Sequence, residues 1–354
     1  MRSTVAVIGA GAWGTTVAKV IADKGHDVVL WCFEKETADE INTRHINGKF
    51  LPGIPLPEGL RALTNLDEAA SGREVLILAV PSLFLLTTVK QLLSVPSIRE
   101  GQTAIAVITK GFLETPNGPT LILDTLEDYL PGFYRKSLAY IAGPSHAEEV
   151  ARGKITGLIS ASQNPKNAMR FRYLLKSSRL LVFASLDVRG VQVAAAVKNV
   201  IAIAFGIMDA LKTDSGDTEE MFGDNTESLL LAAGLNEIQI LGMAMGATHR
   251  ETFSSISGVG DLDVTCRSML GRNRRFGREI VEKNILEPFK NLDDLLARIG
   301  EIGYMPEGTA AAKYVRILAD KHRLRMPIST GLYQILNREI KPMEFLRNFL
   351  KSME

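Results

Sequence analysis

The sequence predicts an α/β, doubly wound N-terminal domain over residues 1–188 and an all-α C-terminal domain over residues 189–354. Three observations carry this prediction. Short apolar runs typical of buried strands alternate with helical patterns up to about residue 188. The first run leads into the spacing G-x-G-x-x-G at Gly9, Gly11 and Gly14. Beyond residue 188 the strand pattern stops and only helical patterns continue.

The stretch 4–34 reads as strand, glycine turn, helix and second strand. Gly9 allows a tight turn out of the strand, Gly11 leaves room for a pyrophosphate, and Gly14 lets the helix pack on the sheet. The first N–H groups of that helix have no partner inside the helix, so they favour an anion. This context favours a Rossmann-type dinucleotide site over an unrelated glycine-rich turn.

The end of the second strand should select the cofactor. Glu34 lies 20 residues beyond Gly14, where an acid would bind the ribose 2′-OH of NAD. Phe33 is placed to pack on adenine, whereas Lys35 is placed to meet a 2′-phosphate. The sequence therefore favours NAD and leaves NADP open.

Composition bounds the class of protein. A chain of 354 residues with 46% hydrophobic and 23% charged residues is ordinary for a soluble globular protein of two domains. The net charge of +1 gives no indication of nucleic-acid binding. Cys32 and Cys266 are too few for a disulfide framework or a metal cluster. We therefore expect no metal, a cytoplasmic location, and a packed thiol at Cys266.

No targeting or membrane segment is expected. The N-terminus is already a strand rather than a signal peptide. The most apolar long stretch, 191–208, carries Lys198 and Asn199 near its centre, which a bilayer would make costly.

The remaining elements of the first domain follow from apolar runs, helical periodicity and turn residues. Residues 51–60 are expected to be loop because they hold three prolines and two glycines. Polar residues at strand ends are site candidates, namely Pro81-Ser82, Lys110-Gly111 and Gly143-Pro144-Ser145. Further strands are expected at 63–64, 74–80, 102–109, 138–142, 155–161 and 180–184, and helices at 36–49, 83–94, 119–130 and 165–177.

The second half should be helical, with an exposed acidic loop at 212–224. The expected helices are 189–210, 226–246, 249–255, 272–283, 292–299, 308–320, 328–336 and 342–352. The first of these is apolar nearly all round, so it is buried, and Lys198 beside Asn199 in its middle needs a reason. Either Lys198 extends to the surface and Asn199 is a satisfied core amide, or Lys198 does acid–base chemistry. We favour the second interpretation.

Two further clusters carry polar chemistry. Asp261 and Thr265 are four residues apart, so one helical turn would align them, and Arg272 with Asn273 suits a phosphate. Glu307 stands at a helix start, where it either favours the helix dipole or reaches the cofactor, and both interpretations stay open. A solvated basic helix face is expected for Arg274, Arg275 and Arg278.

Ten segments together resemble the NAD(P)-dependent glycerol-3-phosphate dehydrogenases of the bacterial soluble type. The resemblance runs over almost the whole length of the chain. The segments are G-A-G-A-W-G-T (9–15), L-P-G (51–53), A-V-P-S (79–82), T-K-G (109–111), G-P-S-H-A-E-E-V (143–150), V-K-N-V-I-A-I-A-F-G (197–206), G-D-N-T (223–226), G-V-G-D-L-D-V-T-C (258–266), G-R-N-R-R-F-G (271–277) and P-E-G-T-A (306–310).

The resemblance implies reversible reduction of dihydroxyacetone phosphate to sn-glycerol 3-phosphate by NADH or NADPH, for glycerophospholipid synthesis. It implies a C-terminal domain like that of 6-phosphogluconate dehydrogenase, and a homodimer is our default expectation. Lys198 would be the catalytic acid/base, with Lys110 and Asp261 setting its position and pKa. Substrate-binding residues would be Lys110, Gly143, Ser145, Lys198, Asn199, Asp261, Thr265, Gly271, Arg272 and Asn273. The cofactor-binding residues, which include the three glycines and Glu34, would be Gly9, Gly11, Ala12, Trp13, Gly14, Phe33, Glu34, Lys110, Ala147, Arg272, Met305 and Glu307.

Two departures from the bacterial pattern bear on cofactor choice. Gly271 stands where bacterial members often have Ser, and W-C-F-E at 31–34 resembles NAD-using eukaryotic members. Both departures weaken an NADP preference. Two alternatives compete with this assignment: a hydroxy-acid dehydrogenase of the same build, and a non-catalytic dinucleotide sensor. The sensor would not need polar residues at Lys110, Lys198, Asp261 and Arg272, which are all present.

Overall fold

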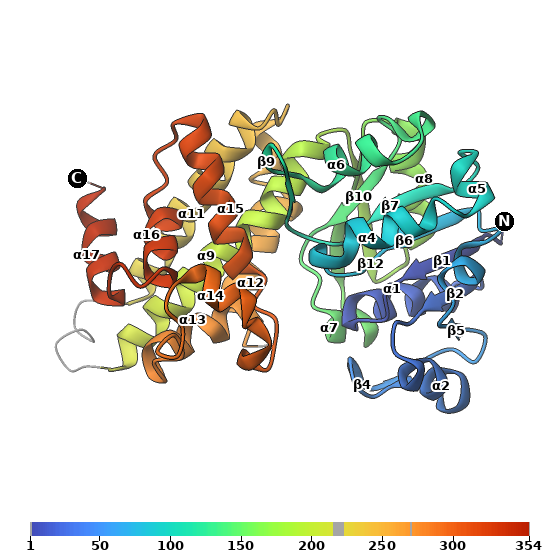
Figure 1. Ribbon diagram of the computed structural model, residues 1–354, viewed down its shortest axis with the longest axis horizontal. Coiled ribbons are helices and arrows are strands. Elements are labelled where there is room, and N and C mark those ends of the chain that lie inside the picture. The colour runs from blue at the N-terminus through green and yellow to red at the C-terminus, as the bar shows by residue number, and fades with distance from the viewer. Residues whose placement is uncertain (1, 215–222, 270, 354) are drawn as a thin grey trace. The chain divides into compact units, whose positions relative to one another are not determined.

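The computed structural model describes residues 2–214, 223–269 and 271–353 (Figure 1). The chain divides into two compact units. The first holds the residues up to Leu113 together with Thr120–Val188, and the second holds Glu114–Pro119 together with the chain from Arg189 onward. The predicted division assigned 114–119 to the first domain, whereas these six residues pack with the second unit. Residues 215–222 of the predicted acidic loop lie outside the described residues.

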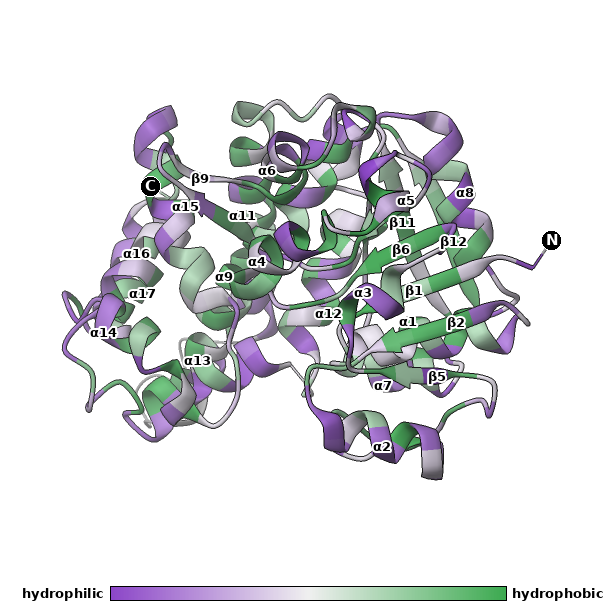
Figure 2. Cartoon of the chain, turned by 45° about the vertical axis from the view of Figure 1, so that its right-hand side comes forward, coloured by the Kyte–Doolittle hydropathy of each residue, from purple (hydrophilic) through white to green (hydrophobic). Residues whose placement is uncertain are grey.

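The first unit is built on one eight-stranded sheet of order β12-β11-β10-β7-β6-β1-β2-β5. Every residue of β6, β7 and β10 is buried, which requires cover on both faces of the sheet. In Figure 2, β6 is coloured as hydrophobic along its length. The strands are β1 (Thr4–Ile8), β2 (Asp27–Trp31), β5 (Arg61–Leu63), β6 (Val75–Leu78), β7 (Ala104–Val107), β10 (Ala139–Ala142), β11 (Thr156–Ser162) and β12 (Leu180–Ser185).

Most neighbours in this sheet are parallel, as predicted. β1 pairs with β2 in the register Thr4 to Asp27 and with β6 in the register Val5 to Val75. The exception is β10 with β11, which run antiparallel, and β12 then follows β11 in parallel. The helices of this unit are α1 (Ala12–Asp23), α2 (Lys35–Arg44), α3 (Leu66–Ala70), α4 (Ser82–Leu92), α5 (Pro96–Arg99), α6 (Ile122–Tyr129), α7 (Ala147–Ala151) and α8 (Pro165–Leu175), with a 3₁₀ turn at Gly132–Tyr134.

Alternate strand residues divide the core of the first unit. Val5 and Val7 of β1 face a cluster that includes Ile21 of α1 and Phe171 of α8, so α1 and α8 share one face of the sheet. The intervening residue Ala6 is fully buried as well, which places it under the opposite cover. This arrangement holds the start of α1 against the end of β1.

Three predictions for residues 36–130 differ from the structure. The helix expected at 36–49 ends at Arg44, because His45 adopts a left-handed conformation with φ 53°. The expected loop at 51–60 contains the strand β4 (Leu51–Pro55), which pairs antiparallel with β3 (Ile46–Asn47). The helix expected at 119–130 starts at Ile122, because β9 (Gly118–Leu121) pairs with β8 (Phe112–Thr115).

The second unit is helical around α9 (Val188–Asp214). The described part of α9 from Val191 to Ile207 is almost completely buried. The helix predicted at 249–255 is a 3₁₀ turn at Arg250–Thr252 followed by a π-helical turn at Ile256–Gly260. The other elements are α11 (Asp224–Ala244), α12 (Asp261–Arg267), α13 (Arg272–Glu282), α14 (Leu292–Ala297), a 3₁₀ turn at Ile299–Ile302, α15 (Gly308–His322), α16 (Pro327–Leu336) and α17 (Pro342–Lys351).

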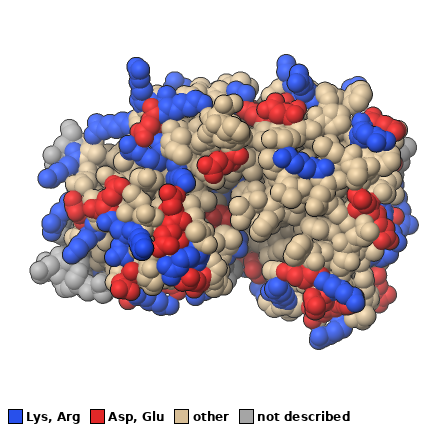
Figure 3. All heavy atoms as spheres, in the orientation of Figure 1, with Lys and Arg blue, Asp and Glu red and all other residues tan. Residues whose placement is uncertain are grey.

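In length and apolar composition, Val188–Lys212 matches a membrane span, and it alone does so among the described residues. Its apolar window is wholly buried inside the protein, which is typical of the core helix of a globular unit. On the face shown in Figure 3, basic and acidic side chains lie among one another rather than in separate patches.

Candidate active site

The glycine turn has the geometry that its spacing predicts. Gly9 has φ 120°, a conformation that favours glycine, and its N–H donates to the Trp31 carbonyl at 3.1 Å. A Cβ on Gly14 would lie 2.0 Å from the Gly9 carbonyl oxygen, so only glycine permits this approach. Gly11 differs, because a Cβ there would meet no atom within 4 Å. The turn is therefore tight at Gly9 and Gly14 and open at Gly11.

A buried amide supports this turn from a distance along the chain. Asn47 Nδ2 donates to the Ala10 carbonyl and to Thr15 Oγ1, both at 2.9 Å, and Asn47 is fully buried. Its Oδ1 accepts from the Phe50 N–H at 3.1 Å. Sequence analysis missed Asn47, because nothing near it in the chain links it to a turn 37 residues earlier.

The residues expected around the start of α1 do lie together. Trp13, Ala12 and Ala147 pack on a small apolar cluster with Leu51 and Ile54. Thr16 Oγ1 donates to the Ala147 carbonyl at 3.1 Å, which joins α1 to α7. The buried Trp13 Nε1 has no hydrogen-bond partner among the described residues.

The end of β2 presents the two residues expected at the adenosine. Phe33 is 83% exposed, as a ring awaiting a stacking partner would be. Glu34 Oε1 accepts from Lys49 Nζ at 3.0 Å. Lys49 is a second cation near Glu34, in addition to Lys35, and sequence analysis missed it.

Lys110 meets the polar residues that follow β10. Lys110 Nζ donates to Ser145 Oγ at 3.2 Å and to the Gly143 carbonyl at 3.5 Å. β7 and β10 are parallel neighbours, so their carboxyl ends lie at one edge of the sheet. The predicted trio Lys110, Gly143 and Ser145 is thus brought together within the first unit.

In the second unit a buried ion pair is built on α9 and α12. Lys198 Nζ donates to Asp261 Oδ1 and, at 2.9 Å, to Thr265 Oγ1. The side chains of Lys198 and Asp261 are 6% and 0% exposed. Thr265 Oγ1 in turn donates to the Asp261 carbonyl at 2.6 Å, one helical turn earlier. Of the two interpretations of Lys198, the one that sends it to the surface is therefore wrong.

Close helix contacts fix the surroundings of Lys198. The π-helical turn depends on Gly258, where a Cβ would lie 2.0 Å from the Phe253 carbonyl oxygen. The next residue along α9, Asn199, is buried, and its carbonyl oxygen would lie 2.5 Å from a Cβ on Gly308. Only glycine therefore lets α15 start against α9 at this point.

Arg272 and Glu307 form a more open pair. Arg272 Nη2 lies 3.9 Å from Glu307 Oε1, and both side chains are partly exposed. Asn273 is buried, and its Oδ1 accepts from the Gly308 N–H at 2.9 Å. Gly271 precedes α13 at its N-cap, and Met305 is half-buried two residues before Glu307.

The prediction of a solvated basic face on α13 was wrong for two of its three arginines. Arg275 is largely exposed, but Arg274 and Arg278 both donate to Asp209 Oδ2 of α9, at 2.6 and 2.9 Å. The helices approach because Gly206 and Gly277 lack side chains: each Cβ would lie 2.1 Å from a carbonyl oxygen of the other helix. The cations therefore turn toward α9 rather than toward solvent.

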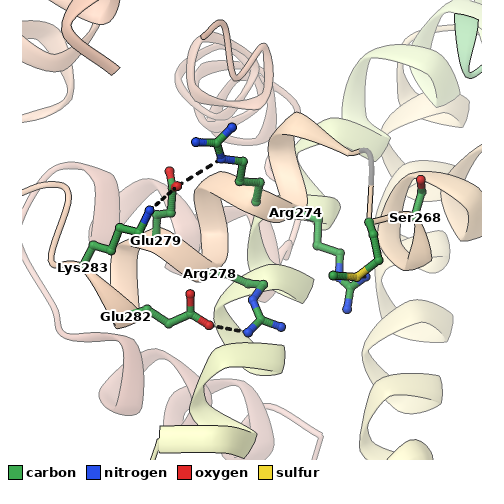
Figure 4. Close-up of a pocket in the computed structure, with 8 residues that line it drawn as sticks. Ser268, Arg274, Arg278, Glu279, Glu282 and Lys283 are labelled. Atoms are coloured by element: carbon green, nitrogen blue, oxygen red, sulfur yellow. Dashed lines mark hydrogen bonds and ion pairs between the residues drawn. The ribbon is translucent and has the colours of Figure 1, made fainter. Parts of the chain in front are cut away.

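A hollow of about 160 Å³ lies beside α13 (Figure 4). Its cations face carboxylates, as the Lys283–Glu279 and Arg278–Glu282 pairs show. It is lined by Ser268, Met269, Arg274, Arg275, Arg278, Glu279, Glu282 and Lys283.

Neither cysteine has the setting of a nucleophile. Burial, with smaller contributions from nearby carboxylates, raises the pKa of both Cys32 and Cys266 to about 12. Both thiols are free and buried, so the packed thiol predicted at Cys266 is confirmed. Among the described residues, no group of three or more His, Cys, Asp or Glu side chains could hold a metal ion.

Comparisons with known proteins cover both units. The model of the NAD-dependent glycerol-3-phosphate dehydrogenase N-terminus matches residues 4–168, and that of the C-terminus matches residues 187–347. A Treponema denticola protein named glycerol-3-phosphate dehydrogenase (NAD(P)+) is 56% identical, with 99% of each chain covered. A Treponema pallidum protein of the same name is 50% identical, over 98% of this chain and 99% of its own. The crystal structure of glycerol-3-phosphate dehydrogenase from Coxiella burnetii is similar with a TM-score of 0.83 at 30% identity, covering 99% of both chains.

Proposed function

The chain belongs to the NAD-dependent glycerol-3-phosphate dehydrogenase family, and we propose that it reduces dihydroxyacetone phosphate reversibly to sn-glycerol 3-phosphate, with Lys198 as proton donor. The observation that carries this assignment of roles is the buried Lys198–Asp261–Thr265 cluster. A lysine buried in a helix core and held by a carboxylate and a hydroxyl has one defined orientation, as proton transfer requires.

The first unit fits a dinucleotide. The open space at Gly11 suits a pyrophosphate, and the first turn of α1 has no side-chain cap that would compete for its N–H groups. Trp13 Nε1 offers a further donor, and Phe33 an exposed ring. The bound NAD(P)H supplies the hydride that reduces C2 of the substrate ketone.

Lys198 acts on the oxygen of that ketone. As an ammonium it donates a hydrogen bond to the carbonyl oxygen, stabilises the negative charge that develops there, and transfers its proton to form the alcohol. Asp261 supports the ammonium form by pairing with it, and Thr265 holds Nζ from a second side. In the reverse direction the neutral amine accepts the proton of the glycerol 3-phosphate 2-hydroxyl.

Arg272 is the phosphate ligand in this proposal. Its side chain is 58% exposed, and its ion pair with Glu307 is long, at 3.9 Å. A phosphate dianion can therefore compete with Glu307 for the guanidinium. The amide of Asn273 and the N-terminus of α13 add donors at the same place. We assign Lys110 and Ser145 to polar contacts with substrate or cofactor, on the support of their mutual hydrogen bond.

The test is NADH and NADPH oxidation by the full chain, with and without dihydroxyacetone phosphate. We expect turnover only with the phosphate ester, and none with dihydroxyacetone or a 2-oxo acid. Turnover with a 2-oxo acid instead would contradict the phosphate role of Arg272 and favour a hydroxy-acid dehydrogenase.

Cofactor choice is read from the same assay. Glu34→Gln removes the acid that favours NAD and leaves the nearby cation Lys49, with Lys35 next in sequence, to favour a 2′-phosphate. We expect the ratio of kcat/KM for NADPH to that for NADH to rise about 3- to 10-fold, the size of one hydrogen bond. An unchanged ratio would remove Glu34 from cofactor selection.

We further propose that the protein works in the cytoplasm as a homodimer that feeds glycerophospholipid synthesis and does not bind nucleic acid. Two free thiols suit a reducing compartment, two-fold dimers are the commonest oligomers, and the net charge is only +1. Light scattering during size-exclusion chromatography tests the dimer.

A further inference from the structure

The segment from Tyr304 to Gly308 carries Met305 and Glu307 and leads into α15. It has no regular secondary structure before Glu307, so its position depends on what its side chains and backbone contact. Two of its residues are attached to the same helix, α13, which begins at Arg272.

The first attachment is a buried carboxylate. Glu279 of α13 is 6% exposed, and its Oε2 accepts a hydrogen bond from the Tyr304 hydroxyl. Its Oε1 accepts from Arg275 Nε at 3.0 Å and Lys283 Nζ at 2.9 Å, and Figure 4 shows the lysine contact. The Arg275 guanidinium also lies 4.4 Å from the centre of the Tyr304 ring. Tyr304 is therefore held at its hydroxyl and on its ring face.

The charge state of Glu279 suits this role. Burial alone would raise the pKa of Glu279, but hydrogen bonds from Tyr304, Lys283 and Arg275 together lower it, so the carboxylate stays ionised at neutral pH. A hydrogen bond to an ionised acceptor is stronger than a neutral one. The second attachment, Asn273 Oδ1 to the Gly308 N–H at 2.9 Å, fixes the other end of the segment.

We propose that Glu279 and Tyr304 are positioning residues for cofactor binding. They hold the segment that carries Glu307 against α13, so that Glu307 stays beside Arg272. The proposal rests on the proposed function and on the cofactor contact that the family resemblance implies for Glu307. Glu279 and Tyr304 act through Glu307 and take no part in the chemistry. Release of Tyr304 frees one end of the segment, so Glu307 must then be ordered at the moment of binding, which lowers affinity.

The first experiment measures the Kd for NADH of the full chain by fluorescence titration, without dihydroxyacetone phosphate. Tyr304→Phe removes one hydroxyl and keeps the ring under Arg275. We expect its Kd to rise about 3- to 10-fold, a change of the size that one ordinary hydrogen bond contributes. The KM for dihydroxyacetone phosphate at saturating NADH should stay within about twofold of that of the unaltered protein. Such a change is smaller than the loss of one hydrogen bond to the substrate would cause.

Matched controls separate this effect from a general loss of stability. Tyr314→Phe removes another tyrosine-to-carboxylate hydrogen bond of the second unit, from Tyr314 to Glu114 at 3.4 Å. Glu301→Gln is the control for Glu279→Gln. It removes the carboxylate of a residue that pairs with Arg298 and lies three residues before Tyr304 in the sequence. We expect both controls to keep the Kd for NADH of the unaltered protein.

A double variant tests whether Tyr304 acts through Glu307. In the Glu307→Gln background, Tyr304→Phe should cause no further rise in Kd, because the carboxylate that it positions is gone. Additive effects of the two substitutions would contradict the proposed route. If Tyr304→Phe and Glu279→Gln lower the Tm but leave the Kd unchanged, the two residues are structural only.

The outcomes also distinguish this proposal from the proposed function. If the unaltered protein binds NADH but does not reduce dihydroxyacetone phosphate, the proposed function is wrong, while the Kd series still decides the positioning role. If the unaltered protein binds neither NADH nor NADPH, both proposals are overturned.

Discussion

The two units differ in what forms their candidate sites: mainly backbone in the first, and buried charged side chains in the second. The first unit uses backbone and absent side chains: a turn closed by Gly9 and Gly14 and left open at Gly11. The second unit uses a pair of charged side chains, Lys198 and Asp261, buried in a helical core. A long dinucleotide is bound by many weak, dispersed contacts, whereas proton transfer needs one group held in one place.

The comparison predicts how each unit fails. A substitution at the buried pair should remove turnover and leave cofactor binding, because the pair is proposed to act on the substrate ketone and not to contact the cofactor. A substitution at the glycine turn should act through packing or through cofactor affinity. The following predictions test this division, from the largest expected effect to the smallest.

Lys198→Ala should lower kcat by about 10²- to 10⁴-fold, because it removes the proposed proton donor and, with it, the charge proposed to stabilise the alkoxide. The Kd for NADH, measured by fluorescence titration, should not change. Because the substitution leaves Asp261 buried without its cation, the Tm should fall as well. The double variant Lys198→Ala/Asp261→Asn is the control: it should regain stability but not turnover. Recovery of turnover in it would exclude Lys198 as the proton donor.

Gly14→Ala should destabilise the first unit, since the new Cβ would lie 2.0 Å from the Gly9 carbonyl oxygen. We expect a loss of about 1 to 3 kcal/mol in the free energy of unfolding by urea. Gly11→Ala is the matched control, because its Cβ meets nothing within 4 Å. It should keep the stability and weaken NADH binding. Equal stability losses in both variants would break the proposed distinction between a closed and an open glycine.

Arg272→Ala should raise the KM for dihydroxyacetone phosphate about 10- to 100-fold, the range for charged hydrogen bonds to a phosphate. Initial rates at saturating NADH measure this. Arg267→Ala, which removes a half-exposed arginine paired with Asp263, should change neither KM. An Arg272 effect confined to NADH affinity would argue against a phosphate site in the second unit.

Glu237 is a second buried carboxylate of the helical unit, and it contrasts with Asp261 because no cation pairs with it in the contacts described. It accepts from the N–H groups of Ile328 and Ser329, at 2.6 and 3.0 Å, and from Ser329 Oγ at 2.6 Å. Burial outweighs these hydrogen bonds and raises the pKa of Glu237 from 4.5 to about 7. The folded protein therefore keeps a proton that the unfolded chain loses between these two pH values.

The sign follows from this difference. Stability from Glu237 is present below pH 4.5 and is lost as the pH rises through about 7. Glu237→Gln cannot ionise, so its free energy of unfolding should fall less over this window, by about 1 to 3 kcal/mol. Urea unfolding at pH 5 and pH 8 measures it, with the exposed Glu344→Gln as control. An equal pH dependence in Glu237→Gln and in the unaltered protein would mean that the carboxylate is already ionised in the fold at pH 5.

The parts of the site that sequence analysis predicted correctly rest on local pattern. The spacing of Gly9, Gly11 and Gly14 is informative because turn, helix start and sheet contact all occur within six residues. Burial of Lys198 followed from the apolar residues on every side of its helix. Ten short segments in one order then identified the family, which the comparisons confirmed.

What was missed depends on residues far apart in the chain. Asn47 reaches a turn 37 residues earlier, and Glu237 reaches a helix start 91 residues later. Arg274 and Arg278 looked solvated because α13 is polar in composition, and only the contact of Gly206 with Gly277 turned them toward Asp209.

By itself the sequence determined the α/β and all-α halves, the dinucleotide turn and the burial of the helix that carries Lys198, because periodicity and spacing act over a few residues. Only the tertiary structure decided that β11 and β12 run antiparallel to the other strands of the sheet. It also decided that Asp261, directly after a π-helical turn, pairs with Lys198, and that the Tyr304 hydroxyl donates to Glu279. Such contacts form only when packing brings distant segments together, and no local pattern encodes which buried polar group will meet which partner.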